Sequence, residues 1–337
     1  MGEVLQCVKC ENPSTIAGCE GKNVAYCDGC YRDMITHKFR SALGKKRVFK
    51  DGASKSALVV SDGSPESAFL LGQLKEALAL DAHKRLVMEP TIITVVSSLS
   101  PGIMQRVEGR TIHLAAVLRD NSQKLDLEGT KDSEIERLAT LTASCRSGSA
   151  KAELLRILKE RLVLRLAAEL SLCTVLVPES ADFLARLALT SLCLGRGGQI
   201  SDMTAMVEKR RGNATIVRPL KEIRTKEIAM GNRLFGWESM VIFVDGEEAR
   251  VAEWGSIQGD THQFVETLQG EGFQATVSTV LSTASKVHSN VSNTATPCKL
   301  CLRSFSRELS TLCPPCSSVL DEIPDWNSIR HLMDGSS

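Results

Sequence analysis

Short apolar runs alternate with longer amphipathic stretches along the middle of the chain. The first run, 57–60, reads Ala-Leu-Val-Val and is followed by a Ser-Asp-Gly-Ser-Pro turn and a helical pattern over 66–80. A run without polar interruption predicts a strand covered on both faces, and the turn residues mark its end. Similar runs at 92–97, 173–177 and 214–217 predict further strands.

Helical patterns fall between these strands. We expect helices over 32–43, which Gly44 would stop, over 181–194 and over 221–234. The longest runs from a cap at Ser149 to about residue 170, and its buried face would carry Leu154, Leu155, Leu158, Leu162 and Leu166. Strands that alternate with helices predict a parallel sheet with helices on both faces. The expected fold class is therefore α/β.

Length and hydropathy exclude some classes of protein. The chain has 337 residues, which is enough for a well-formed core. Arg165 and Glu169 interrupt the most hydrophobic stretch, 162–177, so no run reaches the roughly 18 apolar residues of a membrane span. No apolar stretch follows the first seven residues, so we expect no secretory signal and a soluble chain in a compartment where disulfides are rare.

Eight of the 12 cysteines form two sets of paired C-x2-C motifs near the ends of the chain. Four thiolates can close a tetrahedron around one zinc ion, so we predict two zinc ions, one in each set. Disulfide pairs and an iron–sulfur cluster are the alternatives, and Cys19 could replace a neighbouring ligand. The predicted metal ligands are Cys7, Cys10, Cys27 and Cys30 in the first set, and Cys298, Cys301, Cys313 and Cys316 in the second.

The formal net charge of +1 does not indicate nucleic-acid binding, but the distribution of charge does. The segment 37–50 holds six lysines and arginines and no acid, with Phe39 and Phe49 among them. Such a cluster beside a metal knuckle is typical of phosphate contact, with a solvated surface as the alternative. A second basic stretch, 209–226, is another candidate. The RNA-binding residues expected from the first cluster are Lys38, Arg40, Lys45, Lys46 and Arg47.

The turn after the first strand lies where a nucleotide binds in an open α/β sheet. A phosphate cradle needs small residues and free N–H groups, and Gly63, Ser64 and Ser67 suit this role. Asp62 would repel phosphate, and Pro65 removes one N–H donor. These residues alone favour an ordinary turn that Ser64 caps.

Other catalytic chemistry finds little support in the sequence. None of the six histidines stands at metal-ligand spacing or beside a nucleophile. Cys145 has an arginine beside it that could lower its pKa, whereas Cys173 and Cys193 occupy apolar positions and are expected in the core. We predict no catalytic residue.

The domain organisation follows from these patterns. The segment 282–297 is rich in Ser, Thr and Asn and predicts a linker. We expect a zinc knuckle with the basic segment over 1–50, the α/β domain over 51–281, the linker over 282–297 and a second zinc knuckle over 298–337.

Several motifs together carry a resemblance to a known family. A knuckle ending CDGCYRDM, followed by HKFRSALGK, a strand and a degraded Ser-Gly-Gly-type loop, resembles the cytoplasmic tRNA 2-thiolation protein 2 family. The similarity extends to the closing CKLC and CPPC pairs and to RPLKEIRTKEI at 218–228. That family belongs with the PP-loop ATP pyrophosphatases, so the resemblance implies a PP-loop ATP pyrophosphatase-like sheet flanked by the two zinc knuckles.

The resemblance implies a cytoplasmic subunit that binds tRNA and forms a heterodimer with a catalytic tRNA thiolation subunit. The complex would place sulfur on the wobble uridine of the lysine, glutamate and glutamine tRNAs, in the formation of 5-methoxycarbonylmethyl-2-thiouridine. A thiocarboxylated ubiquitin-related modifier would supply the sulfur.

Departures from the family's active sister define the expected role of this chain. Against its S-G-G-x-D-S loop, Asp62 replaces a glycine and Ser67 is reached only through a one-residue insertion. Cys145 stands alone where the sister carries a C-x2-C, and 236–239 offers no cysteine. We therefore expect a non-catalytic subunit that does not use ATP, with a degenerate nucleotide loop comprising Ser61, Asp62, Gly63 and Ser67.

Two alternatives remain open at this point. One is an active PP-loop ATP pyrophosphatase and tRNA sulfurtransferase in its own right. The other is a zinc-knuckle protein-interaction adaptor resembling a ubiquitin-ligase module, although such a module interleaves its ligands locally and the two cysteine sets here lie far apart in the sequence.

Overall fold

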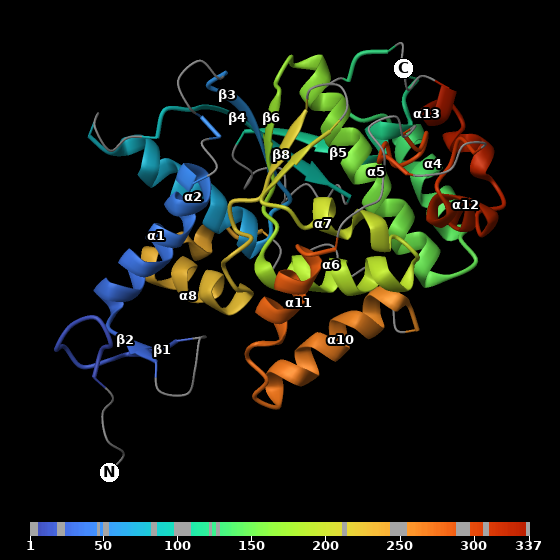
Figure 1. Ribbon diagram of the computed structural model, residues 1–337. Helices are drawn as coiled ribbons and strands as arrows, with labels where there is room; N and C mark the ends of the chain where they lie inside the picture. Colours follow the sequence, from blue (N-terminus) through green and yellow to red (C-terminus); the bar gives the residue numbers. More distant parts are fainter. Residues whose placement is uncertain are drawn as a thin grey trace.

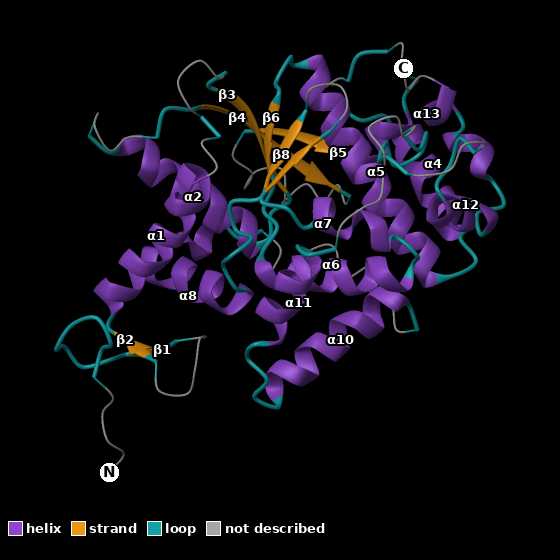
Figure 2. Cartoon of the chain, in the orientation of Figure 1, coloured by secondary structure: helices purple, strands orange, loops and turns teal. Residues whose placement is uncertain are grey.

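One central sheet surrounded by helices makes up most of the molecule (Figures 1 and 2). The structure is a computed structural model. It describes residues 6–18, 24–45, 48–49, 54–81, 86–97, 109–120, 123–125, 129–210, 214–242, 255–287, 297–305 and 310–334.

The sheet has six strands in the order β5-β4-β3-β6-β8-β7. All neighbours run parallel except β7, which is antiparallel to β8. Residues of β3 alternate between two cores, since Leu58 and Val60 face one and Ala57 and Val59 face the other. Cover on both faces explains the uninterrupted apolar run. The strands are β3 (Ser56–Ser61), β4 (Glu89–Val96), β5 (Arg110–His113), β6 (Thr174–Leu176), β7 (Val207–Lys209) and β8 (Thr215–Val217).

One face of the sheet is covered by three helices, and the N-terminal knuckle continues their hydrophobic cluster at its outer end. The helices are α1 (Asp28–Lys45), α2 (Pro65–Ala79) and α8 (Thr225–Phe235). A short hairpin, β1 (Ile16–Ala17) with β2 (Ala25–Tyr26), precedes α1 and shares its hydrophobic cluster. Figure 1 places this hairpin at the outer end of α1, near the N-terminus.

The opposite face is covered by α4 (Asp132–Ala143), α5 (Gly148–Glu169) and the C-terminal knuckle with α12 (Pro314–Asp321). The knuckle is part of this core, because its four cysteines belong to the same hydrophobic cluster as the leucines of α5. The remaining short elements of this side are η1 (Leu114–Leu118), η5 (Trp326–Ile329) and α13 (His331–Asp334).

A third group of helices packs together below the sheet in Figure 1. Here α6 (Ala181–Cys193) packs against α10 (Ile257–Gly270) and α11 (Thr276–Ala284). Three short elements, η2 (Gly197–Gln199), α7 (Ile200–Met203) and η4 (Trp237–Met240), link the larger ones. Within the described residues, no helix is both long and apolar enough to cross a bilayer.

The predicted α/β class and the four predicted strands are confirmed, and several boundaries are corrected. Helix α1 begins inside the first knuckle and continues through Gly44, because a glycine in a helical conformation need not end a helix. Helix α5 is capped by Ser147, whose hydroxyl accepts from the Ala150 N–H, and not by Ser149. Helix α8 begins at Thr225, four residues later than predicted.

Other predictions are wrong in ways that burial makes clear. Cys173 and Cys193 are exposed, because the former precedes β6 and the latter ends α6. Leu155 is half-buried, whereas the other four leucines of its helix are buried. Helix α11 extends through Ala284, into the segment expected to be a linker, and 288–296 lie outside the described residues.

Candidate functional site

The N-terminal cysteine set brings its four thiols together at the start of a helix. Cys7 and Cys10 lie on a turn beside the Gln6–Pro13 bridge, while Cys27 immediately precedes α1 and Cys30 lies in its first turn. The Sγ atoms of Cys10 and Cys27 are 3.6 Å apart, and those of Cys10 and Cys30 are also 3.6 Å apart. Cys7 is buried and the other three are half-buried.

The C-terminal set repeats this design. Cys298 and Cys301 lie on a turn, Cys313 caps α12 and Cys316 lies in the first turn of that helix. The Cys313 N–H donates to the Cys298 sulfur at 3.3 Å, and the Cys301 and Cys313 sulfurs are 3.8 Å apart. All four cysteines are buried. In both sets two cysteines come from a turn and two from a helix start.

The spacing of the sulfurs fits one tetrahedral ion in each set. In either set the four sulfur atoms lie within 4.8 Å of one another. Bonds of about 2.3 Å in a regular tetrahedron put two thiolates about 3.8 Å apart, which matches the measured 3.6 and 3.8 Å. In a four-iron cluster each cysteine binds a different iron, so the sulfurs are more widely separated than around one ion. The geometry favours a single ion.

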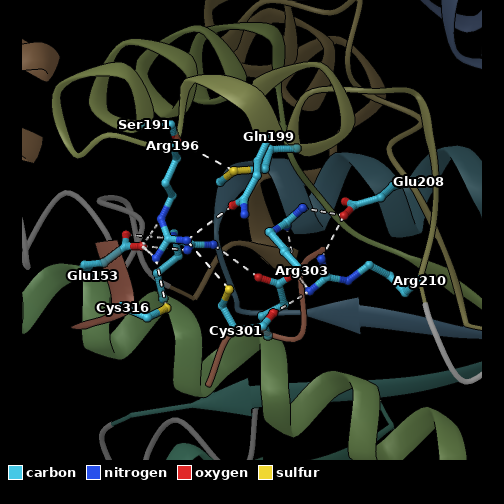
Figure 3. A network of polar contacts seen from close by, with 12 residues as sticks. Glu153, Ser191, Arg196, Gln199, Glu208, Arg210, Cys301, Arg303 and Cys316 are labelled. Atoms are coloured by element: carbon cyan, nitrogen blue, oxygen red, sulfur yellow. Dashed lines mark hydrogen bonds and ion pairs between the residues drawn. The ribbon is translucent and has the colours of Figure 1, made fainter. Parts of the chain in front are cut away.

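The polar surroundings of the two sets differ. The Cys7 sulfur accepts from backbone N–H groups of its own knuckle. The C-terminal sulfurs instead meet a guanidinium from the body, because Arg196 donates to three of them (Figure 3). Burial alone would lower the pKa of Arg196, but the Glu153 carboxylate and the sulfurs outweigh it and hold that pKa well above its usual value.

A buried network of ion pairs extends from this centre into the sheet (Figure 3). From the knuckle, Arg303 reaches Glu160 on α5 at 2.8 Å and also pairs with Glu208 on β7. Arg210 joins the same two carboxylates, to Glu160 at 2.5 Å and to Glu208 at 3.0 Å. Burial would raise the pKa of Glu160, but Arg210 and Arg303 lower it to about 2. This quartet therefore stays ionised in the core.

The degenerate nucleotide loop is occupied by its own aspartate. The Asp62 carboxylate accepts the Ser64 N–H at 3.2 Å and the Ser67 hydroxyl at 2.7 Å through one oxygen, and the Lys159 ammonium at 3.0 Å through the other. Gly63 adopts a left-handed φ of 76°, which shapes the turn. Burial would raise the pKa of Asp62, but Lys159 and the two hydrogen bonds hold it well below its usual range. An internal anion thus takes the donors that a phosphate would need.

The neighbouring helix N-termini are also satisfied by carboxylates. Glu66, in the first turn of α2, meets the hydroxyls of Ser180 at 3.5 Å and Thr225 at 3.2 Å, from the starts of α6 and α8. Asp182 accepts the Thr225 N–H at 2.8 Å and the Gln269 amide at 2.8 Å. Burial and the nearby Asp62 charge raise the pKa of Glu66. Helix N-termini attract anions, and here the chain supplies them.

A cavity of about 100 Å³ remains at this carboxyl edge of the sheet. Its apolar wall includes Val60 and Val177, from the ends of β3 and β6. Since β3 pairs with β4 on one side and β6 on the other, this is the switch point where open α/β sheets bind ligands. The charged residues that line the cavity belong to the ion pairs already described or extend them: Asp62, Arg156, Lys159, Glu160, Glu179, Arg218 and Arg303.

An aromatic stack packs against α2, the helix that follows the loop. Trp237 stacks on Phe235 with centroids 4.4 Å apart and meets Phe69 edge-on. A Cβ on Gly72 would come within 2.3 Å of the Trp237 ring, so that position needs glycine. Just beyond, the Ile242 N–H donates to the Gly63 carbonyl at 2.9 Å. This segment presents a packed tryptophan and no cysteine over 235–242.

The predicted RNA-binding cluster is only partly described. Lys38 is paired with the buried Glu227 at 2.8 Å, so its charge is not wholly available to a ligand, whereas Arg40 is exposed. Lys45 ends α1. Lys46 and Arg47, together with the side chain of Lys45, lie outside the described residues, as does Cys19.

Four cations of the second basic stretch, 209–226, contact groups inside the fold. Arg210 and Arg218 both pair with Glu208, Arg224 pairs with Asp182, and the Lys221 ammonium donates to the Thr204 carbonyl at 2.5 Å. These four cations stabilise the fold, whereas Lys209 and Lys226 of the same stretch are exposed and 211–213 lie outside the described residues.

Cys145 is not activated by its neighbour. Its thiol donates to the Leu141 carbonyl at 3.6 Å, and burial raises the pKa of Cys145, contrary to the lowering that Arg146 suggested. The arginine points instead to the Asp321 carbonyl at 3.5 Å. Lys159 and Arg196, which contact the loop and the metal set, were not identified from the sequence, because neither stands in a recognisable motif.

Comparisons with known proteins agree with the resemblance drawn from the sequence. A sequence model of the family described as cytoplasmic tRNA 2-thiolation protein 2 matches residues 256–329. The protein of that name from Caenorhabditis briggsae is 35% identical over 329 residues, covering 93% of this chain and 92% of the relative. The Caenorhabditis elegans protein is 32% identical, with 93% of each chain covered. The Danio rerio protein is 28% identical over 97% of this chain and 74% of its own.

Among solved structures, the fold is similar to the U34-tRNA thiolase NcsA from Methanococcus maripaludis with its [4Fe-4S] cluster. The TM-score is 0.62 over 95% of this chain and 97% of the thiolase, at 13% sequence identity. This likeness shows that the two chains share a fold, the mostly parallel sheet with helices on both faces. The identity to the nematode relatives over nearly the whole length shows that the chain belongs to the cytoplasmic tRNA 2-thiolation protein 2 family.

Proposed function

We propose that this chain is the tRNA-binding, non-catalytic subunit of a complex that 2-thiolates the wobble uridine of the lysine, glutamate and glutamine tRNAs. It would form a heterodimer with the catalytic thiolation subunit and act in the cytoplasm, as the names of its relatives suggest. The product would be 5-methoxycarbonylmethyl-2-thiouridine, with sulfur from a thiocarboxylated ubiquitin-related modifier.

The Asp62 carboxylate carries the proposal of a non-catalytic role. It occupies the loop donors and pairs with Lys159, so a nucleotide phosphate would have to displace a partly buried ion pair. Leaving one charge of a fully buried pair without its partner costs about 3–5 kcal/mol, and the smaller cost for this partly buried pair still opposes binding. Cys145 and the packed Trp237 segment add no second thiol for sulfur transfer.

The test is reconstitution with each subunit alone and with both. The purified chain with ATP and tRNA is expected to release no pyrophosphate and to form no 2-thiouridine. Adding the catalytic subunit and the sulfur carrier should restore thiolation. Pyrophosphate release by this chain alone would instead support the alternative of an active PP-loop sulfurtransferase.

We also propose zinc as the ion of both cysteine sets, because four thiolates at these distances suit a single tetrahedral ion. Native mass spectrometry combined with elemental analysis should find two zinc ions per chain. Iron and inorganic sulfide in a set would assign a cluster there.

For tRNA contact, we propose the surface of α1 that carries Arg40 and the adjoining basic residues Lys45, Lys46 and Arg47. Alanine at these four positions should weaken tRNA binding and flatten its dependence on salt, because fewer counterions are released. A matched variant removes four exposed cations elsewhere: Lys131, Lys286, Lys299 and Arg330. Equal losses in both variants would point to nonspecific charge in place of a defined surface.

A further inference from the structure

Arg196 occupies an unusual position for a charged residue. Its side chain is 0% exposed, and it lies in the Gly-Arg-Gly-Gly turn between α6 and α7. Gly195 adopts a left-handed φ of 76° after α6, and the Arg196 N–H donates back to the Ser191 carbonyl at 2.7 Å. Glycine at the position after a helix end allows this reversal. The turn thereby aims the guanidinium into the C-terminal knuckle.

The guanidinium divides its donors between sulfur and carboxylate (Figure 3). One terminal nitrogen lies 3.7 Å from the Cys301 sulfur and 3.6 Å from that of Cys313, and the other lies 3.4 Å from Cys316. The Nε group donates to Glu153 at 2.8 Å. Gln199 also accepts, at 3.4 Å. Three of the four predicted ligands therefore share one cationic neighbour.

The net negative charge of the metal centre explains why a cation lies beside it. Four thiolates around one divalent ion leave a net charge of about −2, and in a buried site that charge lacks solvation. A guanidinium in contact with the sulfurs offsets part of the cost, and hydrogen bonds to the ligands fix their orientation. Glu153 holds the guanidinium in place through Nε and, at 2.7 Å, through the same terminal nitrogen that meets Cys316.

The charge of the N-terminal set is stabilised in a different way. Three of its cysteines are half-buried and reach solvent, and among the described residues its sulfurs meet backbone amides and one another. Solvent can screen that charge, so no guanidinium is required.

We propose that Arg196 is a positioning and charge-balancing residue for the C-terminal metal centre, so that retention of metal at this centre, and not at the N-terminal one, depends on Arg196. The inference rests on metal occupancy as proposed above, and extends it to a residue outside the cysteine motif.

The test measures zinc release from the full-length chain carrying Cys7→Ser and Cys10→Ser, which leaves the C-terminal set as the complete site. A chelating dye in excess reports the release rate. Arg196→Met should speed release on the order of 10- to 100-fold, the usual effect of losing a partner of a metal ligand. With cobalt in place of zinc, the sulfur-to-cobalt absorption bands should shift in this variant.

Three companion variants keep the outcome interpretable. Arg196→Lys retains charge but loses the forked donors, and should release zinc at an intermediate rate. Glu153→Gln removes the negative charge but keeps an amide oxygen that can accept from Nε, so Arg196 should stay at the sulfurs and release should be no faster than in the parent. Arg165→Met, on α5, loses contacts to Glu169 and to backbone carbonyls without touching cysteine, and should leave release unchanged.

The outcomes distinguish the presence of a metal ion from the role of Arg196. A parent chain without bound metal overturns both the metal assignment and this inference. Bound metal with parental release rates in Arg196→Met and Arg196→Lys overturns the role of Arg196 alone. Release from Glu153→Gln as fast as from Arg196→Met also overturns it, because a structural ion pair would then suffice. If Arg196→Met does not fold, Arg196→Lys and Glu153→Gln still decide, since the inference requires faster release in the first and not in the second.

Discussion

At the N-terminal centre the knuckle lies at the outer end of α1 and reaches solvent, whereas the C-terminal centre is buried against α5 in the main core. Both use a turn and a helix start to present four thiols. Within the described residues, the second alone is connected to a chain of buried ion pairs, through Arg196 and Arg303. The same ligand pattern thus serves a peripheral module in one place and the centre of the fold in the other.

The largest test of this contrast removes one pair of ligands at a time. Cys313→Ser with Cys316→Ser should lower the free energy of unfolding by at least about 5 kcal/mol, because the energy of a structural metal is folding energy. Cys27→Ser with Cys30→Ser should cost the body about 1–2 kcal/mol. Chemical denaturation followed by circular dichroism measures both. Equal losses would mean that the two centres support the same core.

Arg303 offers the next test. Replacing it with methionine leaves Glu160 paired with Arg156 and Arg210, and Glu208 paired with Arg210 and Arg218. The loss of two buried ion pairs should cost about 3 kcal/mol, the low end for a broken buried network. The matched change Arg165→Met affects a pair with Glu169 that is partly exposed, and should cost about 1 kcal/mol or less. A small loss in Arg303→Met would show that the network does not join knuckle and sheet energetically.

On the N-terminal side, Tyr31 anchors the knuckle to α1. The ring is 1% exposed and meets Tyr26 edge-on at 5.9 Å. Tyr31→Ala should cost about 3 kcal/mol and speed metal release from the first set alone. Chelator assays on chains with either set disabled would assign the release. An effect on the second set would contradict their separation.

Two glycines on that same side give the smallest effects. Gly72→Ala would push against the Trp237 ring and should cost about 1–3 kcal/mol through overpacking. Gly44→Ala meets open space in the helix α1 and should stabilise by up to about 1 kcal/mol. Thermal unfolding of both variants, with metal content unchanged, would distinguish packing from metal binding on this face. A stabilised Gly72→Ala variant would show that the stack is loose.

The sequence predicted features that depend on local pattern. The apolar run of β3, the Ser64 cap and both cysteine sets were readable, because each is set by neighbours or by fixed spacing. The family resemblance supplied the PP-loop sheet. Arg196 contacts Cys301, which lies 105 residues away in the sequence, and Lys159 contacts Asp62, which lies 97 residues away. No local pattern encodes contacts over such separations.

Burial was predicted less well than the strands and the cysteine sets, because it also depends on contacts between distant parts of the chain. Cys173 directly precedes the first residue of β6, and Cys193 is the last residue of α6. A shift of one residue at either boundary therefore decides whether the cysteine is exposed. The basic stretch 209–226 looked like a phosphate-binding surface because its acidic partners, such as Glu179 and Asp182, come from elsewhere in the chain.

The pairing of Asp62 with Lys159 has a consequence for how the subunit would respond to the state of the cell. An enzyme that binds a nucleotide gains stability in proportion to the logarithm of nucleotide concentration. Here the anion is the Asp62 carboxylate, which is part of the chain and therefore always present beside Lys159. The folded population of this chain should therefore remain constant when energy charge falls, so a partner that depends on it would not lose its scaffold during starvation.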